Sequence, residues 1–167
     1  MFLTGCSDDP LCNCLQGSGN NETESRPLMP FNVVELNQNV DLILRQGNYN
    51  EAKVTAGKNI IDGIKTEVKN GVLYIRNDNK CNWMRDFKNK FTVELTFEEL
   101  DLITYRGSGT IHCADTIRKN KLTLEGWNGT GSINLLINVA EVQLYLHTGS
   151  TDLNVAGLAP VQYLYCS

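Results

Sequence analysis

Six cysteines carry the most distinctive chemistry in this sequence of 167 residues. Cys6 follows Leu3-Thr4-Gly5, and small residues before an N-terminal cysteine are typical of a bacterial lipobox, whose thiol becomes lipid-modified. The acidic run Ser7-Asp8-Asp9 resembles the signal that sends some Gram-negative lipoproteins to the outer face of the outer membrane. We therefore predict lipidation at Cys6. The alternative, an ordinary tail cysteine, stays open because only Met1-Phe2 precede the motif, which leaves out the charged and apolar regions of a signal peptide.

The other five cysteines are an odd number, so at least one thiol remains unpaired. A structural zinc would need a second close pair of Cys or His, and Cys81 stands alone, so we predict no metal site. A disulfide from Cys12 or Cys14 to Cys81 is the better interpretation. It would close a loop of roughly 70 residues, contribute about 4 kcal/mol in the chain-entropy model and require an oxidising, exported location.

Groups that could act as acids, bases or nucleophiles do not converge in the sequence. Five carboxylates of the second half fall at different positions of the internal repeat described below: Asp101, Asp115, Glu125, Glu141 and Asp152. The same holds for His112 and His147, and no Ser or Cys stands in a strained nucleophile turn. We therefore predict a protein that is not an enzyme, with no catalytic residues and no cofactor. A degenerate carbohydrate-active enzyme is the less favoured alternative.

Composition restricts the partners and the number of domains. Fifteen basic and 19 acidic residues give a net charge of −4 without a basic block, which argues against nucleic acid as a partner. No stretch approaches the ~20 apolar residues of a membrane span, so we expect membrane contact only through a lipid anchor. Residues 1–30 are interpreted as the lipobox-like start and a tether, flexible from Gln16 to Ser25, and residues 31–167 as one domain.

Alternation of apolar and polar residues predicts β-strands from Phe31 onward. The predicted strands span residues 31–36, 40–44, 52–56, 72–75 and 91–95. Gly47-Asn48, Gly57-Lys58-Asn59 and Asn70-Gly71 supply turns between them, because Gly and Asn tolerate positive φ. Residues 60–68 look mildly helical, but Gly63 and the β-branched residues argue against a helix.

An internal repeat of about 20 residues dominates the second half. The segments begin at Leu100, Leu122, Val142 and Val161, and in the first three a glycine follows seven residues later, at Gly107, Gly129 and Gly149. This period predicts an all-β fold, a right-handed parallel β-helix (β-solenoid) whose N-terminal strands cap or extend the coil. The expected inward rows are Leu100/Leu122/Val142/Val161, Leu102/Leu124/Leu144/Tyr163, Ile111/Ile133/Leu153 and Cys113/Leu135/Val155. The three glycines are expected at its structural corners, where a Cβ would collide.

One column of the repeat is aromatic. Tyr105, Trp127 and His147 each precede a corner glycine by two residues, and their parity predicts that they point outward. Sugars stack on such side chains, so they form a candidate glycan platform. A surface ladder that holds the strands in register is the alternative with the greater weight.

The sequence resembles the auto-transporter adhesin head domains of the GIN family. The resemblance rests on residues 26–36, the strand 71–75 and the corners Gly107-Ser-Gly109, Gly129-Thr-Gly131 and Gly149-Ser-Thr. It implies an exported or lipid-anchored surface protein with a parallel β-helix and an adhesive role, acting on a cell-surface or extracellular glycan or protein. We expect an outer membrane lipoprotein exposed at the surface, with a periplasmic location and a structural envelope role as alternatives.

The last repeat stops one residue short of a fourth corner glycine. A coil that ends inside a repeat leaves an open parallel edge, which natural proteins rarely tolerate. We therefore expect either a domain shortened at its C-terminus or self-association through this open end.

Overall fold

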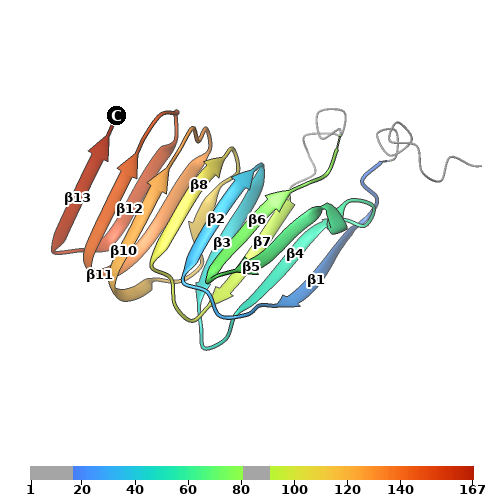
Figure 1. Cartoon of the computed structure of the whole chain (residues 1–167), viewed down its shortest axis with the longest axis horizontal. Helices are drawn as coiled ribbons and strands as arrows, with labels where there is room; N and C mark the ends of the chain where they lie inside the picture. The colour runs from blue at the N-terminus through green and yellow to red at the C-terminus, as the bar shows by residue number, and fades with distance from the viewer. Residues whose placement is uncertain (1–16, 81–90) are drawn as a thin grey trace, which may run out of the picture.

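The computed structural model describes residues 17–80 and 91–167, and these are almost entirely β-structure (Figure 1). The elements in this part of the chain are β1 (Asn21–Pro27), β2 (Val33–Gln38), β3 (Val40–Gln46), β4 (Glu51–Gly57), the 3-10 helix η1 (Ile61–Gly63), β5 (Ile64–Lys69), β6 (Val72–Asn77), β7 (Phe91–Phe97), β8 (Leu102–Gly107), β9 (Ile111–Cys113), β10 (Ile117–Gly126), β11 (Ser132–Leu146), β12 (Asp152–Leu158) and β13 (Val161–Cys166). The five strands predicted in the first half are confirmed as β2, β3, β4, β6 and β7, within two residues at either end.

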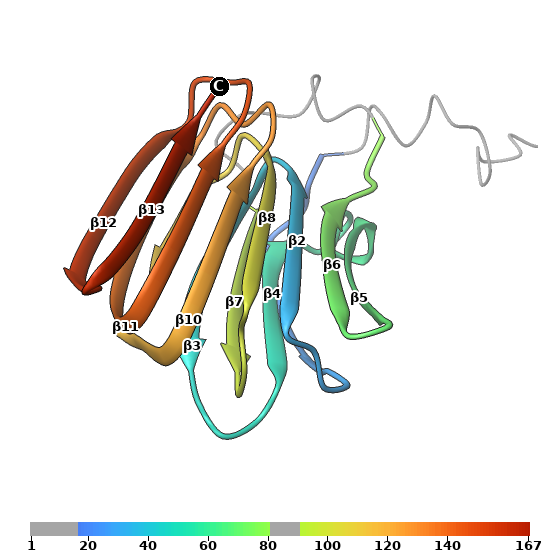
Figure 2. The same ribbon diagram turned by 60° about the vertical axis from the view of Figure 1, so that its left-hand side comes forward.

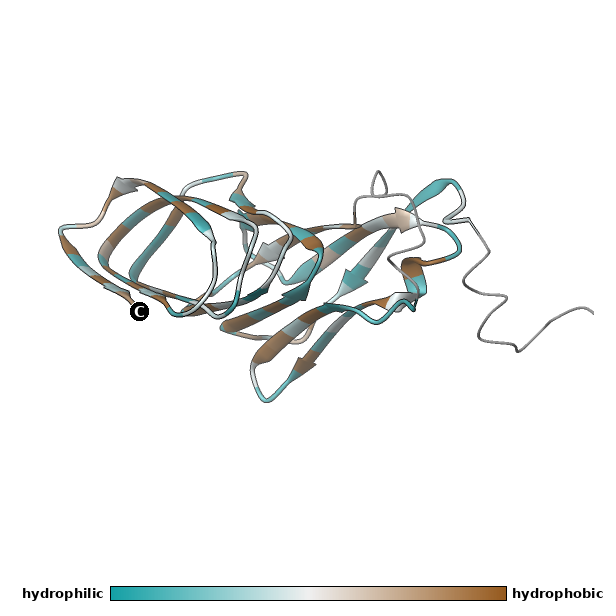
Figure 3. Cartoon of the chain, turned by 90° about the horizontal axis from the view of Figure 1, so that it is seen from above, coloured by the Kyte–Doolittle hydropathy of each residue, from teal (hydrophilic) through white to brown (hydrophobic). Residues whose placement is uncertain are grey.

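The strands lie in two layers that enclose one interior (Figures 1 and 3). The first layer runs β1-β4-β7-β3-β9 to residues 132–138 of β11, and the second runs β5-β6-β2-β8-β10 to residues 141–146 of β11. Because β11 passes from one layer to the other, this path of eleven strands curls into a nearly closed barrel. Outside that path, β12 pairs with the first part of β11 and β13 with the second part.

The predicted right-handed parallel β-helix is wrong, because the sheet is mixed. The repeated segments pair in parallel, and so do β2 with β6 and β8 and β3 with β7 and β9. The pairs β1–β4, β4–β7 and β5–β6 are antiparallel. One cause is the turn at Asn70 and Gly71, whose φ angles of 53° and 78° reverse the chain into the hairpin β5–β6. The N-terminal strands do not cap a parallel coil but continue both layers of the mixed sheet, with β2 between β6 and β8, and β3 between β7 and β9.

The N-terminal segment differs from the expected tether. Residues 21–27 form β1, which pairs along its whole length with β4, so the prediction of a flexible chain is wrong for residues 21–25. The Arg26 guanidinium donates hydrogen bonds to the backbone carbonyls of Ile61 and Ile64, which connects β1 to the start of β5. These hydrogen bonds connect β1 and β5, the two end strands of the eleven-strand path.

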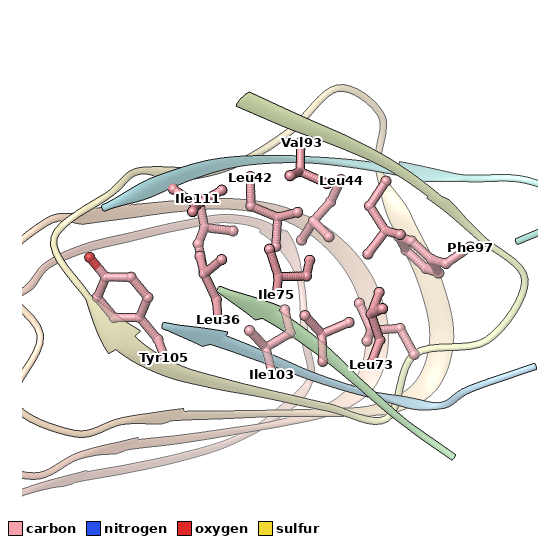
Figure 4. Packing of buried hydrophobic residues seen from close by; sticks show 14 of the residues in the cluster. Leu36, Leu42, Leu44, Leu73, Ile75, Val93, Phe97, Ile103, Tyr105 and Ile111 are labelled. Atoms are coloured by element: carbon pink, nitrogen blue, oxygen red, sulfur yellow. The ribbon is translucent and has the colours of Figure 1, made fainter. Parts of the chain in front are cut away.

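The core is built by alternate residues of both layers. Leu36, Ile75 and Ile103 point inward from the second layer and meet Leu42 and Ile111 of the first, and all five are fully buried (Figure 4). The polar residues between them face outward, as the period of two in a strand requires. Figure 3 shows this alternation along the strands as hydrophobic and hydrophilic bands that follow one another.

Four cysteines that carry sequence predictions lie outside the described residues. These are the lipidation candidate Cys6 and the disulfide candidates Cys12, Cys14 and Cys81, so their predictions stay predictions. Among residues 17–80 and 91–167, no helix has the length and apolar character that a membrane crossing needs.

A partly buried ion pair and a hydrogen bond connect the beginnings of three strands of the second layer, β2, β8 and β10. The Lys119 ammonium, whose side chain is only 12% exposed, contacts the Asp101 carboxylate, and Asn32 Nδ2 donates to the same carboxylate at 2.7 Å. The hydrogen bond from Lys119, together with that from Asn32, lowers the pKa of Asp101. This interaction connects the segment before β2, the segment before β8, and β10.

Acid is therefore expected to weaken this junction. A lowered pKa in the folded state means that the unfolded chain binds more protons, so the stabilisation is present above the ordinary pKa of about 4 and is lost as pH falls through the lowered value. Because Asp101 is half exposed, the contribution should stay below about 1 kcal/mol. Urea unfolding at several pH values should show less acid dependence for Asp101→Asn than for the wild type. Asp62→Asn, an exposed carboxyl in η1, is the control, and an equal reduction in that variant would contradict the assignment.

Candidate binding face

The register of the second layer decides which residues of the aromatic column reach the surface. Tyr105 pairs with Gly126 and not with Trp127, one residue away from the alignment that the repeat suggests. A shift of one residue turns a side chain to the other face of a sheet. Tyr105 is accordingly fully buried, so the prediction that it points outward as part of a glycan platform is wrong.

Tyr105 fills the interior next to β10, whose residue at the paired position is Gly126 and has no side chain. Its hydroxyl donates to the Gly109 carbonyl at 2.7 Å and accepts the Gly131 N–H at 3.1 Å. A Cβ on Gly129 would lie 2.5 Å from the Tyr105 ring, and a Cβ on Gly131 would lie 2.3 Å from its hydroxyl. The absence of side chains at Gly129 and Gly131 therefore leaves the space that the Tyr105 ring occupies. Burial raises the pKa of the Tyr105 hydroxyl, which stays a neutral donor.

The predicted corner glycines lie near one another where the chain turns between the layers. Gly129 and Gly149 form an isolated parallel bridge, and the Thr130 N–H donates to the Gly107 carbonyl at 3.0 Å. A Cβ on Gly107 would meet the Gln38 carbonyl at 2.2 Å, and Gly149 has a φ of +130°. Close approach of another backbone segment therefore requires glycine at position 107, and the positive φ favours glycine at position 149.

The other two residues of the aromatic column stack on the outside of the second layer. The rings of Trp127 and His147 are 3.5 Å apart and inclined by 15°, and the Arg106 guanidinium lies 5.4 Å from the centre of the Trp127 ring. Since β10 lies between β8 and β11, Arg106 and His147 cover opposite faces of Trp127. The Trp127 Nε1–H points to Glu125 at 3.5 Å.

Tyr145 and Tyr165 extend this stack toward the C-terminal end, and Tyr163 lies on the same side of β13. Tyr165 of β13 lies beside Tyr145 of β11, with ring centres 6.5 Å apart, and 5.8 Å from His147. Tyr163 and Tyr165 are 53% and 51% exposed. We call this surface the aromatic face, and define it by Arg106, Trp127, Tyr145, His147, Tyr163 and Tyr165.

The aromatic face is polar at its rims but carries little charge. Tyr145 donates to Gln143 at 3.3 Å, and Gln143 donates to Glu141 at 2.7 Å. From residue 122 to residue 167 the sequence contains no Lys or Arg. The face therefore offers aromatic surface, hydroxyls, an amide, carboxylates and a single guanidinium, that of Arg106 over the Trp127 ring, which suits neutral, hydroxyl-rich or peptide partners better than anionic ones.

The stacking limits how a flat ligand could bind. Both faces of Trp127 are covered, so a sugar ring could reach only its rim, whereas the half-exposed rings of Tyr163 and Tyr165 keep more free surface. The Trp127–His147 pair thus has the geometry of a ladder that holds neighbouring strands in register. The tyrosines are the part of the face with surface available to a partner.

The carboxylates do not converge on one site. Asp101 pairs with Lys119, Asp115 with Arg45, and Glu141, at the rim of the aromatic face, with Lys121. Among the residues that the structure describes, no group of three His, Cys, Asp or Glu side chains could hold a metal ion. Burial raises the pKa of the Cys113 thiol, which packs against the core and stays protonated near neutral pH.

Sequence reasoning missed Tyr145, Tyr163 and Tyr165 as surface residues. In the aligned repeats Val161 stood opposite Val142, whereas the structure pairs Val161 with Glu141 and Tyr165 with Tyr145. A strict spacing of 20 residues, as between the stacked Trp127 and His147, would have aligned the two tyrosines.

A family model matches most of the chain. The family model described as "Putative auto-transporter adhesin, head GIN domain" matches residues 30–164. The chain belongs to this family. The resemblance that the repeated segments predicted is thereby confirmed, and the family match covers β8, β10 and β11 and ends within β13, before Tyr165. No curated protein sequence matches the chain.

Solved structures share the fold of this GIN domain. A "putative adhesin" from Bacteroides fragilis NCTC 9343 has a TM-score of 0.75 at 18% identity over 88% of this chain and 67% of its own. A "putative adhesin" from Parabacteroides distasonis ATCC 8503 gives 0.71 at 18% identity, over 83% and 58%. A "putative lipid binding protein" from the same organism gives 0.63 at 18% identity, over 83% and 68%. At this identity the likeness concerns the fold alone, and the chain spans between 58% and 68% of the length of these proteins.

Proposed function

We propose that the chain is a non-enzymatic surface protein that binds an extracellular glycan or protein through the aromatic face. The observation that carries this proposal is the pair of half-exposed tyrosines on β13. Tyr165 lies 5.8 Å from His147 and continues the Trp127–His147 stack, and Tyr163 lies two residues before it on the same side of the strand. Aromatic residues and Arg are enriched where proteins bind partners, because they combine apolar area with polar rims. Membership of an adhesin-head family supports the same role.

Export and anchoring complete the proposal. Lipidation at Cys6 would place the chain on the outer membrane with the domain facing outward, and a periplasmic location is the alternative. The low charge of residues 122–167 supports a neutral glycan before an anionic polysaccharide. If the partner that binds the aromatic face is a cell-surface protein and not a glycan, the proposed binding surface stays the same and only the class of partner changes.

A structural envelope role is the second candidate, and one observation favours it. Both faces of Trp127 are covered by neighbouring side chains, which is what a register-holding ladder needs. On that reading, Trp127→Ala would lower the stability and leave partner binding unchanged.

Binding measurements separate the two readings. We expect beads coated with the wild type to adhere to bacterial or host cells and to give signals on a glycan array. Tyr163→Ser and Tyr165→Ser should each weaken binding by about tenfold, or ~1.4 kcal/mol, since each removes a half-exposed ring of the aromatic face. Tyr74→Ser is the matched control, because Tyr74 occupies the same outward row of the second layer at the far end, next to Glu35. Equal binding by all variants would contradict the proposal.

A further inference from the structure

The outer face of the first layer carries an open hollow of about 670 Å³ over β9, β11 and β12. Figure 2 shows the two layers at this end of the domain, with β12 in the first and β13 in the second, so the hollow and the aromatic face lie on opposite sides. His112, Asn134 and Leu136 line the hollow and alternate with the buried residues Ile111 and Leu135. Because they point away from the interior, their exposure does not depend on which strand lies beside β12. We call this surface the amide hollow, and define it by His112, Asn134, Leu136, Asn154 and Ala156.

Three polar side chains stand next to one another along one row of the amide hollow. The register pairs His112 with Asn134, and Asn134 with Asn154, on strands about 4.8 Å apart. Asn154 Nδ2 donates to Asn134 Oδ1 at 3.0 Å. Each amide has a donor group and an acceptor oxygen, so this bond leaves the Asn134 amino group and the Asn154 oxygen without a partner among residues 17–80 and 91–167. The exposed imidazole of His112 likewise has no hydrogen-bond partner in these residues.

A second row of the amide hollow is apolar. Leu136, which is 41% exposed, pairs with Ala156, and both follow the asparagines by two residues on the same side of their strands. Lys, Arg, Asp and Glu are absent from the described residues that line the hollow. An anionic ligand would therefore find no cation there. A polar row beside an apolar row suits a ligand that has hydroxyl groups at its edge and C–H groups on its face.

We propose that the amide hollow binds a neutral saccharide. Neighbouring sugar hydroxyls both donate and accept, so they complement the amino group of Asn134, the oxygen of Asn154 and the imidazole of His112. The C–H groups of the sugar ring pack on Leu136. A peptide fits less well, because the strands beneath the hollow use their backbone groups within the sheet, and extended peptides bind sheets at their edges.

This site goes beyond the proposed binding through the aromatic face. Residues 132–138 of β11 belong to the first layer and residues 141–146 to the second, so one strand supports both surfaces, on opposite sides of the domain. A single sugar cannot contact both of them. Binding in the amide hollow uses no residue of the aromatic face, so either proposal can fail while the other holds.

Titration followed by proton–nitrogen correlation NMR tests the proposal. The probes are the neutral disaccharides cellobiose, maltose, lactose and chitobiose, with tetra-alanine as the peptide. At least one disaccharide should shift the side-chain amide signals of Asn134 and Asn154 in a saturable way. Asn134→Ala and His112→Ala should each raise the dissociation constant by about tenfold, since each removes a hydrogen-bonding group. Asn138→Ala is the matched control, because Asn138 is an exposed asparagine on the same side of β11 that does not line the hollow, and it should bind like the wild type.

Three results would overturn the proposal. One is equal affinity of the wild type and Asn134→Ala, which would mean that the polar row only holds the strands in register. Another is the absence of a shift with every disaccharide, and a third is a shift with tetra-alanine alone, which would indicate a peptide site. Tyr165→Ser separates the two surfaces: it should leave the disaccharide affinity unchanged, and a loss of affinity would place the sugar on the aromatic face instead.

Discussion

Replacing Tyr105 with alanine is expected to lower the free energy of unfolding by about 3–5 kcal/mol. The ring is fully buried between the layers, and its removal leaves a cavity that three glycines around it, Gly126, Gly129 and Gly131, have no side chains to fill (Figure 4). The same change leaves the Gly131 N–H and the Gly109 carbonyl without the hydroxyl that joins them. Urea denaturation followed by circular dichroism measures the loss.

Two further variants separate the ring from the hydroxyl. Tyr105→Phe keeps the volume and loses the hydrogen bonds, so it should cost about 1–3 kcal/mol. Tyr74→Ala removes a partly buried tyrosine from the outer side of the second layer, and its cost should be roughly 1 kcal/mol. If Tyr105→Ala and Tyr74→Ala cost the same, Tyr105 does not occupy the interior.

The second large effect is expected for Gly131→Ala. A Cβ at this position would lie 2.1 Å from the Gly109 carbonyl oxygen and 2.7 Å from that of Ser108, so backbone and not only a side chain would have to move. Overpacking of this kind typically costs about 1–3 kcal/mol, and the rigid backbone neighbours place this case at the upper end. A lower urea midpoint with an unchanged slope is the expected result.

Gly17→Ala is the matched control for Gly131→Ala. No atom lies within 4 Å of a Cβ at Gly17, so alanine should be tolerated there without a measurable change in the urea midpoint. The double variant Tyr105→Phe with Gly131→Ala should cost less than the sum of the single changes, because the missing hydroxyl relieves one of the close contacts. Strict additivity would show that the two residues do not share this space.

The strands could be predicted because their alternation is strong. β2, β3, β4, β6 and β7 each carry inward aliphatic residues at every second position, and the structure reproduces them within two residues. β5 escaped prediction because only Ile64 in it is fully buried, so its alternation is weak, and because the turn of η1 blurs its start. The repeat likewise gave the parallel pairs Leu122–Val142 and Ile133–Leu153.

The fold class could not be reached from the repeat, because the repeat covers only the second half. The antiparallel pairs all involve strands of the first half, whose sequence contains no repeat to reveal their neighbours. Because β2 lies between β6 and β8, its residues pair with residues of β8 that come about 70 positions later in the sequence. Alternation of apolar and polar residues does not identify such distant partners.

Only part of the aromatic face was predicted, because the alignment of the first and last repeats was wrong by one position. Spacings of 22 and 19 residues were used for the first and last repeats, whereas the structure pairs Leu124 with Ile103 and Leu164 with Leu144, at spacings of 21 and 20. The error of one residue turned Tyr105 outward in the prediction and hid the Tyr145–Tyr165 pair. Trp127 and His147, whose spacing is the true one, were placed correctly beside each other.

Fluorescence of Trp127 tests the central claim, that the aromatic face is the binding surface, most directly. The sequence has two tryptophans, so Trp83→Phe leaves Trp127 as the sole emitter. Titration of this variant with the glycan that gives the strongest array signal should shift or quench the emission with the same dissociation constant as the array binding. Saturable binding of that glycan with no change in the Trp127 emission, and with equal affinity for Tyr163→Ser and Tyr165→Ser, would contradict the claim.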